Sequence, residues 1–431
     1  MQKYTNKKDA GVFVKTLFVI LCLTFVCQMQ SAIAKTKSDN KKHAVLKKTA
    51  EKKRATKTKS NKNAVTSNKS SDIDNTQFYF LTDASTKEVL LEKNADLRIS
   101  PSSMTKVMTA YVIFDQINRG KLTLQSQCLI GRDAWRKSGS SMFLNYGDKV
   151  SVEELLRGLL AVSGNDAAVA LAESTAGGID NFVDLMNKKA KDLGLKNSHF
   201  ENPHGLAQEG HYMSLRDLAT LTTRFYQDFP QYLDYLGMDE FTYGKVTQHN
   251  RHPLIKAGYD GVIGGKTGYT NDGGYGVIGI VKRGNRSLIG VVNKARTPQQ
   301  RARIITNLMD YGYLNYKKLV LFNKDQEVTN LKTWLADKSS VPAVLHQDVS
   351  FSIPKDKSVD EIKVKVKYKG PLYSPIAAGS KIATLIVDVK GYKTFEYPLF
   401  AKETVDKAGY LGRINQILRY KGKIFLNKFL R

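Results

Sequence analysis

The stretch Arg98–Phe114, RISPSSMTKVMTAYVIF, places a serine and a lysine one helical turn apart at the head of an apolar segment. A Ser-Pro pair followed by two serines predicts a helix start, because a capping hydroxyl then precedes a proline whose missing N–H costs little. The apolar residues behind it predict a helix buried on more than one face. Ser103 and Lys106 would share a helix face at spacing i, i+3. A lysine at the buried end of a core helix is costly without a partner, so the stretch also indicates chemistry.

Ser-x-x-Lys alone is weak evidence, because the chain contains at least two further copies, at 38–41 and 352–355. The first lies in a polar segment with almost no large apolar residue. In the second, Pro354 prevents the serine and the lysine from sharing a helical turn. Only at 103–106 does an apolar helix body follow, so that the amine could take the serine proton and activate a nucleophile.

Two further motifs follow in the chain. Ser163-Gly164-Asn165 lies between two helical stretches of 150–178, and Lys266-Thr267-Gly268 opens a segment rich in glycine and β-branched residues. Ser-x-x-Lys with Ser-Asp-Asn and Lys-Thr-Gly is the signature of class A β-lactamases and penicillin-binding proteins, and Ser163-Gly164-Asn165 stands in the place of the second motif with glycine at its middle position. A literal Ser-Asp-Asn at 38–40 is rejected, because it precedes the nucleophile in a segment that cannot hold an amide in place.

The residues around the motifs, at 102–112, 138–173, 182–206 and 258–279, resemble those of the low-molecular-mass penicillin-binding proteins. More narrowly, they resemble serine-type D-alanyl-D-alanine carboxypeptidases over residues 77–316. The resemblance implies an α+β class, with a β-lactamase/transpeptidase-like domain of a sheet and a helix cluster. A small all-β domain and a C-terminal amphipathic helix would follow.

The resemblance also implies three catalytic residues. Ser103 would attack the carbonyl between two D-alanines of a peptidoglycan stem pentapeptide and form an acyl-enzyme. Lys106, held neutral by burial and nearby cations, would be the base. Ser163 would relay a proton toward the leaving D-alanine. β-Lactam antibiotics would act as covalent inhibitors at the same serine.

The resemblance further implies a set of substrate-binding residues. Asn165 would hydrogen-bond Lys106 or the substrate amide. Lys266 and Thr267 would bind the terminal carboxylate, and Gly268 completes their motif. Tyr269 stands where some relatives carry histidine, and its backbone N–H would line an oxyanion hole with that of Ser103.

Four further residues outside the three motifs are expected to have smaller roles. Arg251 is a further candidate to face the cleft. His204 and His211 have no acidic or thiol partner at metal spacing, so they are predicted to be hydrogen-bonded loop residues. Cys128 is predicted to be a buried, inert thiol in a short strand. We expect no metal and no cofactor.

The formal net charge of +27 is concentrated near the chain ends. Residues 1–34 combine lysines, an apolar run and an Ala-Ile-Ala site, which predicts a cleaved signal peptide. The alternative is an uncleaved membrane anchor, although the apolar run is short for one. Residues 35–74, with a net charge of +9, predict a disordered basic tether that is either a solvated spacer or a polyanion-binding arm. We therefore expect an exported protein and no binding of nucleic acid.

Three segments follow the tether. Residues 75–316 are predicted to form the penicillin-binding catalytic domain, with strands at its two ends and helices between them. Residues 317–404 show short alternating strands, at 349–354, 361–368, 381–389 and 392–400, and predict a small β-rich domain. Residues 405–431 predict a basic amphipathic helix lying on an anionic membrane surface at the periplasmic or extracellular face, and the alternative is a helix docked on its own β domain.

Other functions use similar features. A class A β-lactamase would add a glutamate that activates water, and no Glu-x-x-Leu-Asn setting occurs between Asn165 and Lys266. A D,D-endopeptidase would cut peptidoglycan cross-links with the same apparatus. A catalytically inactive wall-binding protein would depend on the basic ends instead. The intact motif set favours a D-Ala-D-Ala carboxypeptidase that attaches peripherally to the membrane.

Overall fold

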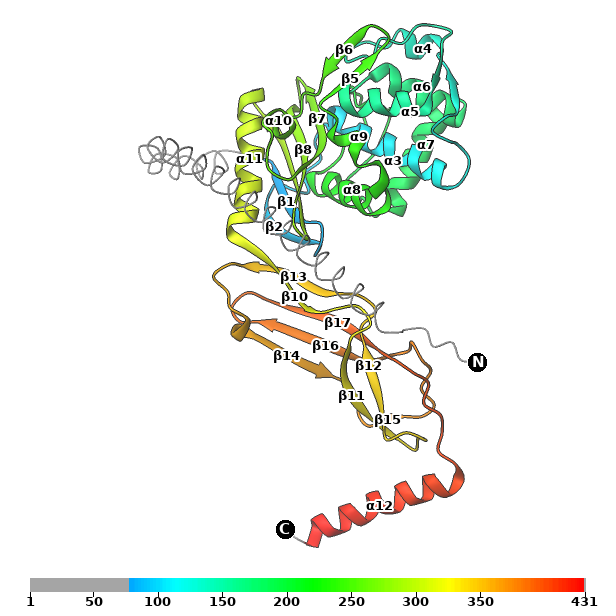
Figure 1. Ribbon diagram of the computed structural model, residues 1–431, viewed down its shortest axis with the longest axis vertical. Helices are drawn as coiled ribbons and strands as arrows, with labels where there is room; N and C mark the ends of the chain where they lie inside the picture. The colour runs from blue at the N-terminus through cyan, green and yellow to red at the C-terminus, as the bar shows by residue number, and fades with distance from the viewer. Residues whose placement is uncertain (1–76, 430–431) are drawn as a thin grey trace, which may run out of the picture. The chain divides into compact units, whose positions relative to one another are not determined.

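A computed structural model of the protein describes residues 77–429 (Figure 1). The predicted signal peptide (1–34) and basic tether (35–74) lie outside these residues.

The first part of the described chain is built on a five-stranded antiparallel sheet of order β2-β1-β9-β8-β7. Its strands are β1 (Tyr79–Asp83), β2 (Glu88–Lys93), β7 (Val262–Thr270), β8 (Gly274–Arg283) and β9 (Arg286–Ala295). The sheet therefore joins two segments far apart in the sequence, through the pairing of β1 with β9. The strands predicted at the two ends of the segment 75–316 are confirmed.

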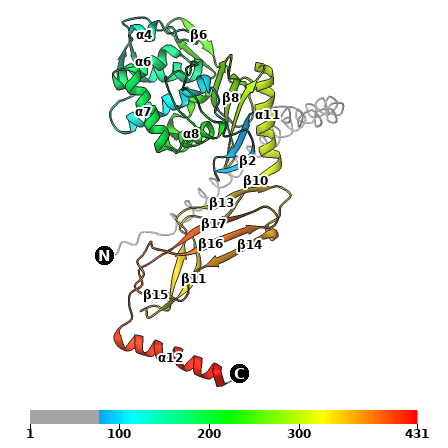
Figure 2. The same ribbon diagram turned by 180° about the vertical axis from the view of Figure 1, so that it is seen from behind.

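Helices cover both faces of this sheet, as Figure 1 and Figure 2 show. Helix α11 (Pro298–Asn315) and the short α10 (Pro253–Lys256) pack on one face, and the other helices of this part gather on the opposite face. Side chains along β8 alternate accordingly: Val277 belongs to the apolar cluster under α11, whereas Ile278 belongs to the larger cluster with the helices. This alternation is what a strand buried on two faces requires. The predicted sheet-and-helix-cluster architecture is confirmed.

The helix cluster surrounds α3 (Lys106–Asn118), ten of whose thirteen residues are buried. The prediction of a helix buried on several faces is therefore confirmed. The cluster also contains α4 (Arg132–Trp135), α5 (Val152–Arg157), α6 (Asn165–Ala176), α7 (Ile179–Asp192), α8 (Leu215–Asp228) and α9 (Asp234–Gly237). Two small hairpins complete this part of the chain: β3 (Gln127–Leu129) with β4 (Lys149–Ser151), and β5 (Glu240–Tyr243) with β6 (Val246–His249). Cys128 is buried in β3, as predicted.

The chain after α11 forms β strands with a separate apolar core. A two-stranded sheet joins β10 (Tyr316–Phe322) and β13 (Val349–Pro354), and a six-stranded sheet has the order β14-β16-β17-β12-β11-β15. The six strands are β11 (Glu327–Trp334), β12 (Ser340–Val344), β14 (Ile362–Lys367), β15 (Leu372–Tyr373), β16 (Lys381–Val389) and β17 (Lys393–Ala401). The predicted strands β13, β14, β16 and β17 are confirmed, whereas β10, β11 and β12 were not individually predicted.

A buried polar cluster joins the two parts. Ser352 Oγ of β13 donates a 2.7 Å hydrogen bond to Asp83 Oδ2, and Arg286 Nε donates another of 2.7 Å to the same oxygen. The Ser352 backbone N–H donates to Glu88 Oε2. Burial raises the pKa of Glu88 to about 7. Because each group is desolvated, the contact depends on complete hydrogen bonding.

The last helix, α12 (Tyr410–Phe429), exposes Leu411, Ile414 and Leu418. Its Gln416 side chain bonds the backbone of Leu335 and Ala336, so its first half also contacts the β strands. Within residues 77–429, no helix is both long and apolar enough to cross a membrane.

Candidate active site

The predicted nucleophile lies in a 3₁₀ turn, Ser102–Thr105, and α3 begins only at Lys106. The predicted capping hydroxyl is wrong, because the N-cap residue is Pro101 and no side chain caps the turn. Ser102 Oγ instead lies 3.1 Å from Thr270 Oγ1 of β7. The start of the turn is therefore held by the sheet, and the i, i+3 spacing still brings Ser103 and Lys106 together.

Lys106 is fully buried and has three hydrogen-bond acceptors. Its Nζ lies 3.1 Å from Ser103 Oγ, 2.7 Å from Asn165 Oδ1 and 2.7 Å from the backbone oxygen of His204. Burial lowers the pKa of Lys106 well below its usual value, and the positive charge of Lys266 adds to the effect. The lowered pKa favours the neutral amine, and a neutral amine in contact with a hydroxyl can accept its proton.

The Ser163-Gly164-Asn165 motif follows a π-helical turn, Gly158–Val162, that continues α5. Ser163 has a left-handed backbone, with φ of 68°, and ends this turn. Its Oγ is buried and has no hydrogen-bond partner in the described part of the chain. Such an unsatisfied hydroxyl is costly in a folded protein unless a ligand supplies its partner.

Both polar atoms of the Asn165 side-chain amide form hydrogen bonds. The side chain accepts from Lys106, and its Nδ2 donates a 2.8 Å hydrogen bond to the backbone oxygen of Ser138. Buried Asp166 next to it accepts from Ser141 Oγ at 2.6 Å and from two backbone N–H groups of the same loop. The loop 138–144 is therefore tied to the motif and forms one border of the site.

Lys266 lies on β7, the edge strand of the sheet, whose unpaired edge faces the nucleophile turn. Gly268 of the same motif lies close to the nucleophile turn. A Cβ atom added to this glycine would be 3.0 Å from the Cβ atom of Ser102. Lys266 is buried, and this burial, together with Arg251 and Arg301, lowers its pKa to about 7. Within residues 77–429, its Nζ donates one long bond of 3.3 Å, to the Thr267 backbone oxygen, so the ammonium is available to an anion.

Tyr269 is half exposed at the end of the motif. Its ring stacks on Tyr275 of β8 with centroids 4.3 Å apart, and its hydroxyl donates to Asn271 Oδ1 at 3.1 Å. The side chain is thus held by local contacts away from the Ser103–Lys106 pair.

The loop with His204 and His211 supports the nucleophile turn. His211 Nε2 lies 2.9 Å from Thr105 Oγ1 and its Nδ1 accepts from the Glu201 backbone, so it is a hydrogen-bonded loop residue as predicted. Burial lowers the pKa of His211 to about 4, which keeps it neutral at pH 7. Within residues 77–429, no three His, Cys, Asp or Glu side chains are grouped so as to hold a metal ion.

Three contributors were not predicted from the motifs. The His204 backbone oxygen binds Lys106, and a backbone atom leaves no residue-type signal in a sequence. Arg301, a buried guanidinium in the first turns of α11, lies near enough to lower the pKa of Lys266. Ser140 Oγ accepts a 3.0 Å hydrogen bond from the exposed Arg251, which ties that candidate to the border of the site.

Two segments of the chain match known protein families. Residues 62–297 match the family of D-alanyl-D-alanine carboxypeptidases of peptidase class S11, and residues 316–407 match the C-terminal domain of penicillin-binding protein 5. The chain is 36% identical over 337 residues to the D-alanyl-D-alanine carboxypeptidase DacF of Bacillus subtilis, covering 77% of this chain and 86% of the relative. It is 33% identical over 343 residues to DacC of Escherichia coli, covering 78% and 86%.

A solved structure is similar over the same region. The penicillin-binding protein 5 structure from Haemophilus influenzae superposes with a TM-score of 0.74 and 33% identity. The superposition covers 77% of this chain and 98% of that one. It therefore includes strands on both sides of α11, and the predicted fold class is confirmed.

Proposed function

The chain belongs to the D-alanyl-D-alanine carboxypeptidase family and is a serine-type hydrolase, and from this premise we propose that Ser103 is its nucleophile. The observation that carries the proposal is the contact of Ser103 Oγ with a buried amine of lowered pKa. Lys106 takes the hydroxyl proton while Oγ attacks the carbonyl of the penultimate D-alanine. The C–N bond breaks, the last D-alanine leaves as an amine, and the acyl group stays on Ser103 as an ester.

Two residues of the second motif assist the transfer of protons. Ser163 Oγ, which has no hydrogen-bond partner among residues 77–429, accepts and passes on the proton that the departing nitrogen needs. Asn165 holds the Lys106 amine toward Ser103 through an uncharged oxygen, which leaves the amine neutral. Water then attacks the ester, and the same groups return the proton to Ser103.

The third motif binds the end of the peptide. The Lys266 ammonium pairs with the terminal carboxylate, and Thr267 and Gly268 flank it on the edge strand. Backbone N–H groups of Ser103 and Tyr269 receive the developing oxyanion. Because Lys266 binds the terminal carboxylate, the enzyme would require a peptide with a free C-terminus, as an exopeptidase does.

The substrate is a peptidoglycan stem pentapeptide, and β-lactams acylate the same serine. Because no glutamate occurs in a β-lactamase-like setting, the penicilloyl ester leaves slowly. The protein is exported by its N-terminal signal and attaches peripherally through α12, whose exposed leucine and isoleucine side chains suit a membrane surface. The basic amphipathic composition of residues 405–431 supports this location.

The test combines labelling and product analysis. We expect penicillin to add its mass to the peptide that contains Ser103, and the wild-type protein to release D-alanine from a stem pentapeptide. Ser103→Ala should abolish both, whereas Ser102→Ala should still be labelled. An adduct on another peptide would overturn the assignment, and preferential cleavage of a cross-linked dimer would favour the endopeptidase.

A further inference from the structure

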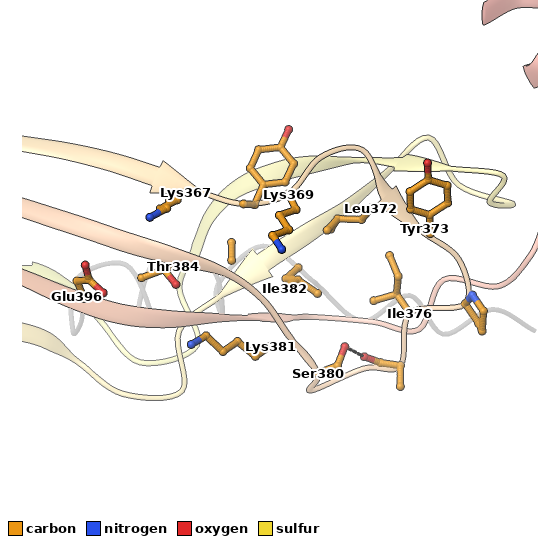
Figure 3. Close-up of a pocket in the computed structure, with 14 residues that line it drawn as sticks. Lys367, Lys369, Leu372, Tyr373, Ile376, Ser380, Lys381, Ile382, Thr384 and Glu396 are labelled. Atoms are coloured by element: carbon orange, nitrogen blue, oxygen red, sulfur yellow. Dashed lines mark hydrogen bonds between the residues drawn. The ribbon is translucent and has the colours of Figure 1, made fainter.

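A second concave site lies in the β strands that follow the catalytic fold. It is a pocket of about 660 Å³ bordered by β14, β15, β16 and the connection 368–377 (Figure 3). None of its lining residues belongs to the three motifs around Ser103. The pocket is therefore a separate feature that the carboxypeptidase reaction leaves unused.

The pocket lies in the most basic part of the β strands that follow α11. Residues 362–395 contain seven lysines and one aspartate, a net charge of +6. The preceding 45 residues, 317–361, contain seven lysines and seven acids, a net charge of zero. The catalytic segment 77–316 carries only +4 over 240 residues. A local excess of this kind attracts anions to one surface.

Three of these lysines border the pocket. In Figure 3, Lys369 lies between Lys367 and Tyr373 on one side, and Lys381 lies on the opposite side. Within the described residues, none of the three ammonium groups forms an ion pair or a side-chain hydrogen bond. Glu396 supplies the one carboxylate, at the far end of the pocket. The three lysines therefore border one hollow from two sides, and their flexible side chains can reach a multidentate anion there.

Aromatic rings complete the lining. Tyr373 is 70% exposed and Tyr368 is 38% exposed, so both rings are accessible to a ligand. The Tyr368 ring lies against Gly370, where an added Cβ atom would come within 2.3 Å of the ring. Because Gly370 has no side chain, it leaves space for the Tyr368 ring at this position. Flat amphipathic rings of this kind provide faces against which a cyclic ligand can stack.

We propose that this pocket binds an acidic polysaccharide, namely those stretches of the peptidoglycan glycan strand whose disaccharides have lost their stem peptides. Sugar rings stack on Tyr368 and Tyr373, and the carboxylates that are free where stems are missing pair with Lys367, Lys369 and Lys381. The pocket thereby holds the polymer while stem peptides on other disaccharides of the same strand are presented to Ser103. This goes beyond the proposed reaction, because binding here needs neither acylation nor a D-alanyl terminus.

The shape of the pocket separates this ligand from a membrane surface. A membrane contact needs a convex apolar face, and α12 already has exposed apolar side chains for that role. The lysines and rings here line a hollow, where a strand gains contact on several sides. A flat bilayer cannot enter such a hollow to reach both Lys369 and Lys381.

The test uses the full chain and fluorescently labelled glycan strands from which the peptide stems have been removed. These strands keep a carboxylate on each disaccharide but cannot occupy the site at Ser103, so the result is independent of the proposed reaction. We expect the combined change of Lys367, Lys369 and Lys381 to Gln to weaken binding about tenfold. Tyr373→Ala should weaken it severalfold at unchanged net charge. Hydrolysis of a soluble pentapeptide should be unchanged in both variants.

The matched control changes three exposed lysines outside the pocket, Lys324, Lys332 and Lys402, to Gln. This variant has the same net charge as the pocket variant and should retain the wild-type dissociation constant. Equal losses in the two triple variants, or an unchanged Tyr373→Ala, would overturn the proposal in favour of unspecific charge attraction. Reduced binding to anionic vesicles with unchanged glycan binding would assign the pocket to the membrane, and tighter binding of single-stranded DNA than of glycan would assign it to another polyanion.

Discussion

Asn165 Oδ1 lies 2.7 Å from Lys106 Nζ, so an uncharged amide contacts the buried amine. A carboxylate at this position would favour the ammonium form, whereas an amide oxygen orients the amine without adding a negative charge. The pKa of Lys106 is lowered mainly by burial, and the positive charges of Lys266 and Arg251 act in the same direction. The identity of residue 165 therefore affects the protonation state of the proposed base.

Replacing this amide by a carboxylate tests the protonation argument. Asn165→Asp should raise the pKa of Lys106, because a negative charge in contact stabilises the ammonium by about one pKa unit or more. The acid limb of kcat/KM for a pentapeptide should then move to higher pH. Asn165→Ala is the control, since it removes the contact without adding charge and should lower the rate without that displacement. The same acid midpoint in both variants would contradict the argument.

The alkaline limb of the pH profile of kcat/KM should reflect the deprotonation of Lys266. Its pKa is lowered to about 7, so the ammonium that binds the carboxylate is present below pH 7 and is lost above it. For a pentapeptide with a free C-terminus, kcat/KM should fall about tenfold per pH unit above this midpoint. Lys266→Arg keeps its charge and should move the limb to higher pH. A C-terminally amidated peptide offers no carboxylate, and its low rate should not follow this limb.

Gly205 should be intolerant of any side chain. Its φ is +83°, and an added Cβ atom would lie 1.9 Å from the backbone oxygen of Ser102. Gly205→Ala should lower the free energy of unfolding by about 2 kcal/mol or more and impair acylation, because the loop also positions the His204 oxygen on Lys106. Gly120→Ala has a similar φ of +69° with no atom within 4 Å, and should cost only about 1 kcal/mol. Denaturant unfolding of the two variants gives the comparison, and equal losses would refute the steric account.

The cluster around Ser352 should make stability depend on pH through Glu88. The pKa of Glu88 is raised to about 7 in the folded chain, above its usual value of 4.5. The folded state therefore binds this proton more tightly than the unfolded state, so stability declines as pH rises from about 4.5 to 7. Glu88→Gln keeps an oxygen acceptor for the Ser352 N–H and cannot ionise. Urea unfolding should show the variant gaining on the wild type between pH 5 and pH 8, and parallel curves would speak against the effect.

Local patterns were sufficient for much of the fold. Alternating apolar residues and turn glycines indicated β7, β8 and β9, because a strand's two faces are recorded in its own sequence. The apolar run after Lys106 indicated a buried helix for the same reason. The strands β10 to β12 were missed, since their half-buried patterns mix polar and apolar residues without clean alternation. The boundaries of the domains and the membrane role of α12 stay predictions.

Residue types and their spacing alone identified Ser103, Lys106 and Lys266 as candidates, because nucleophile, amine and anion-binding cation belong to a recognisable order of motifs. The neutral state of Lys106 required the folded chain, since desolvation depends on every group packed around the amine. The His204 oxygen and Arg301 joined the site only through long-range packing. Likewise, the lysines of 362–395 are visible in the sequence. The pocket that three of them border depends on the pairing of β14 with β16 and on the position of the connection between these strands.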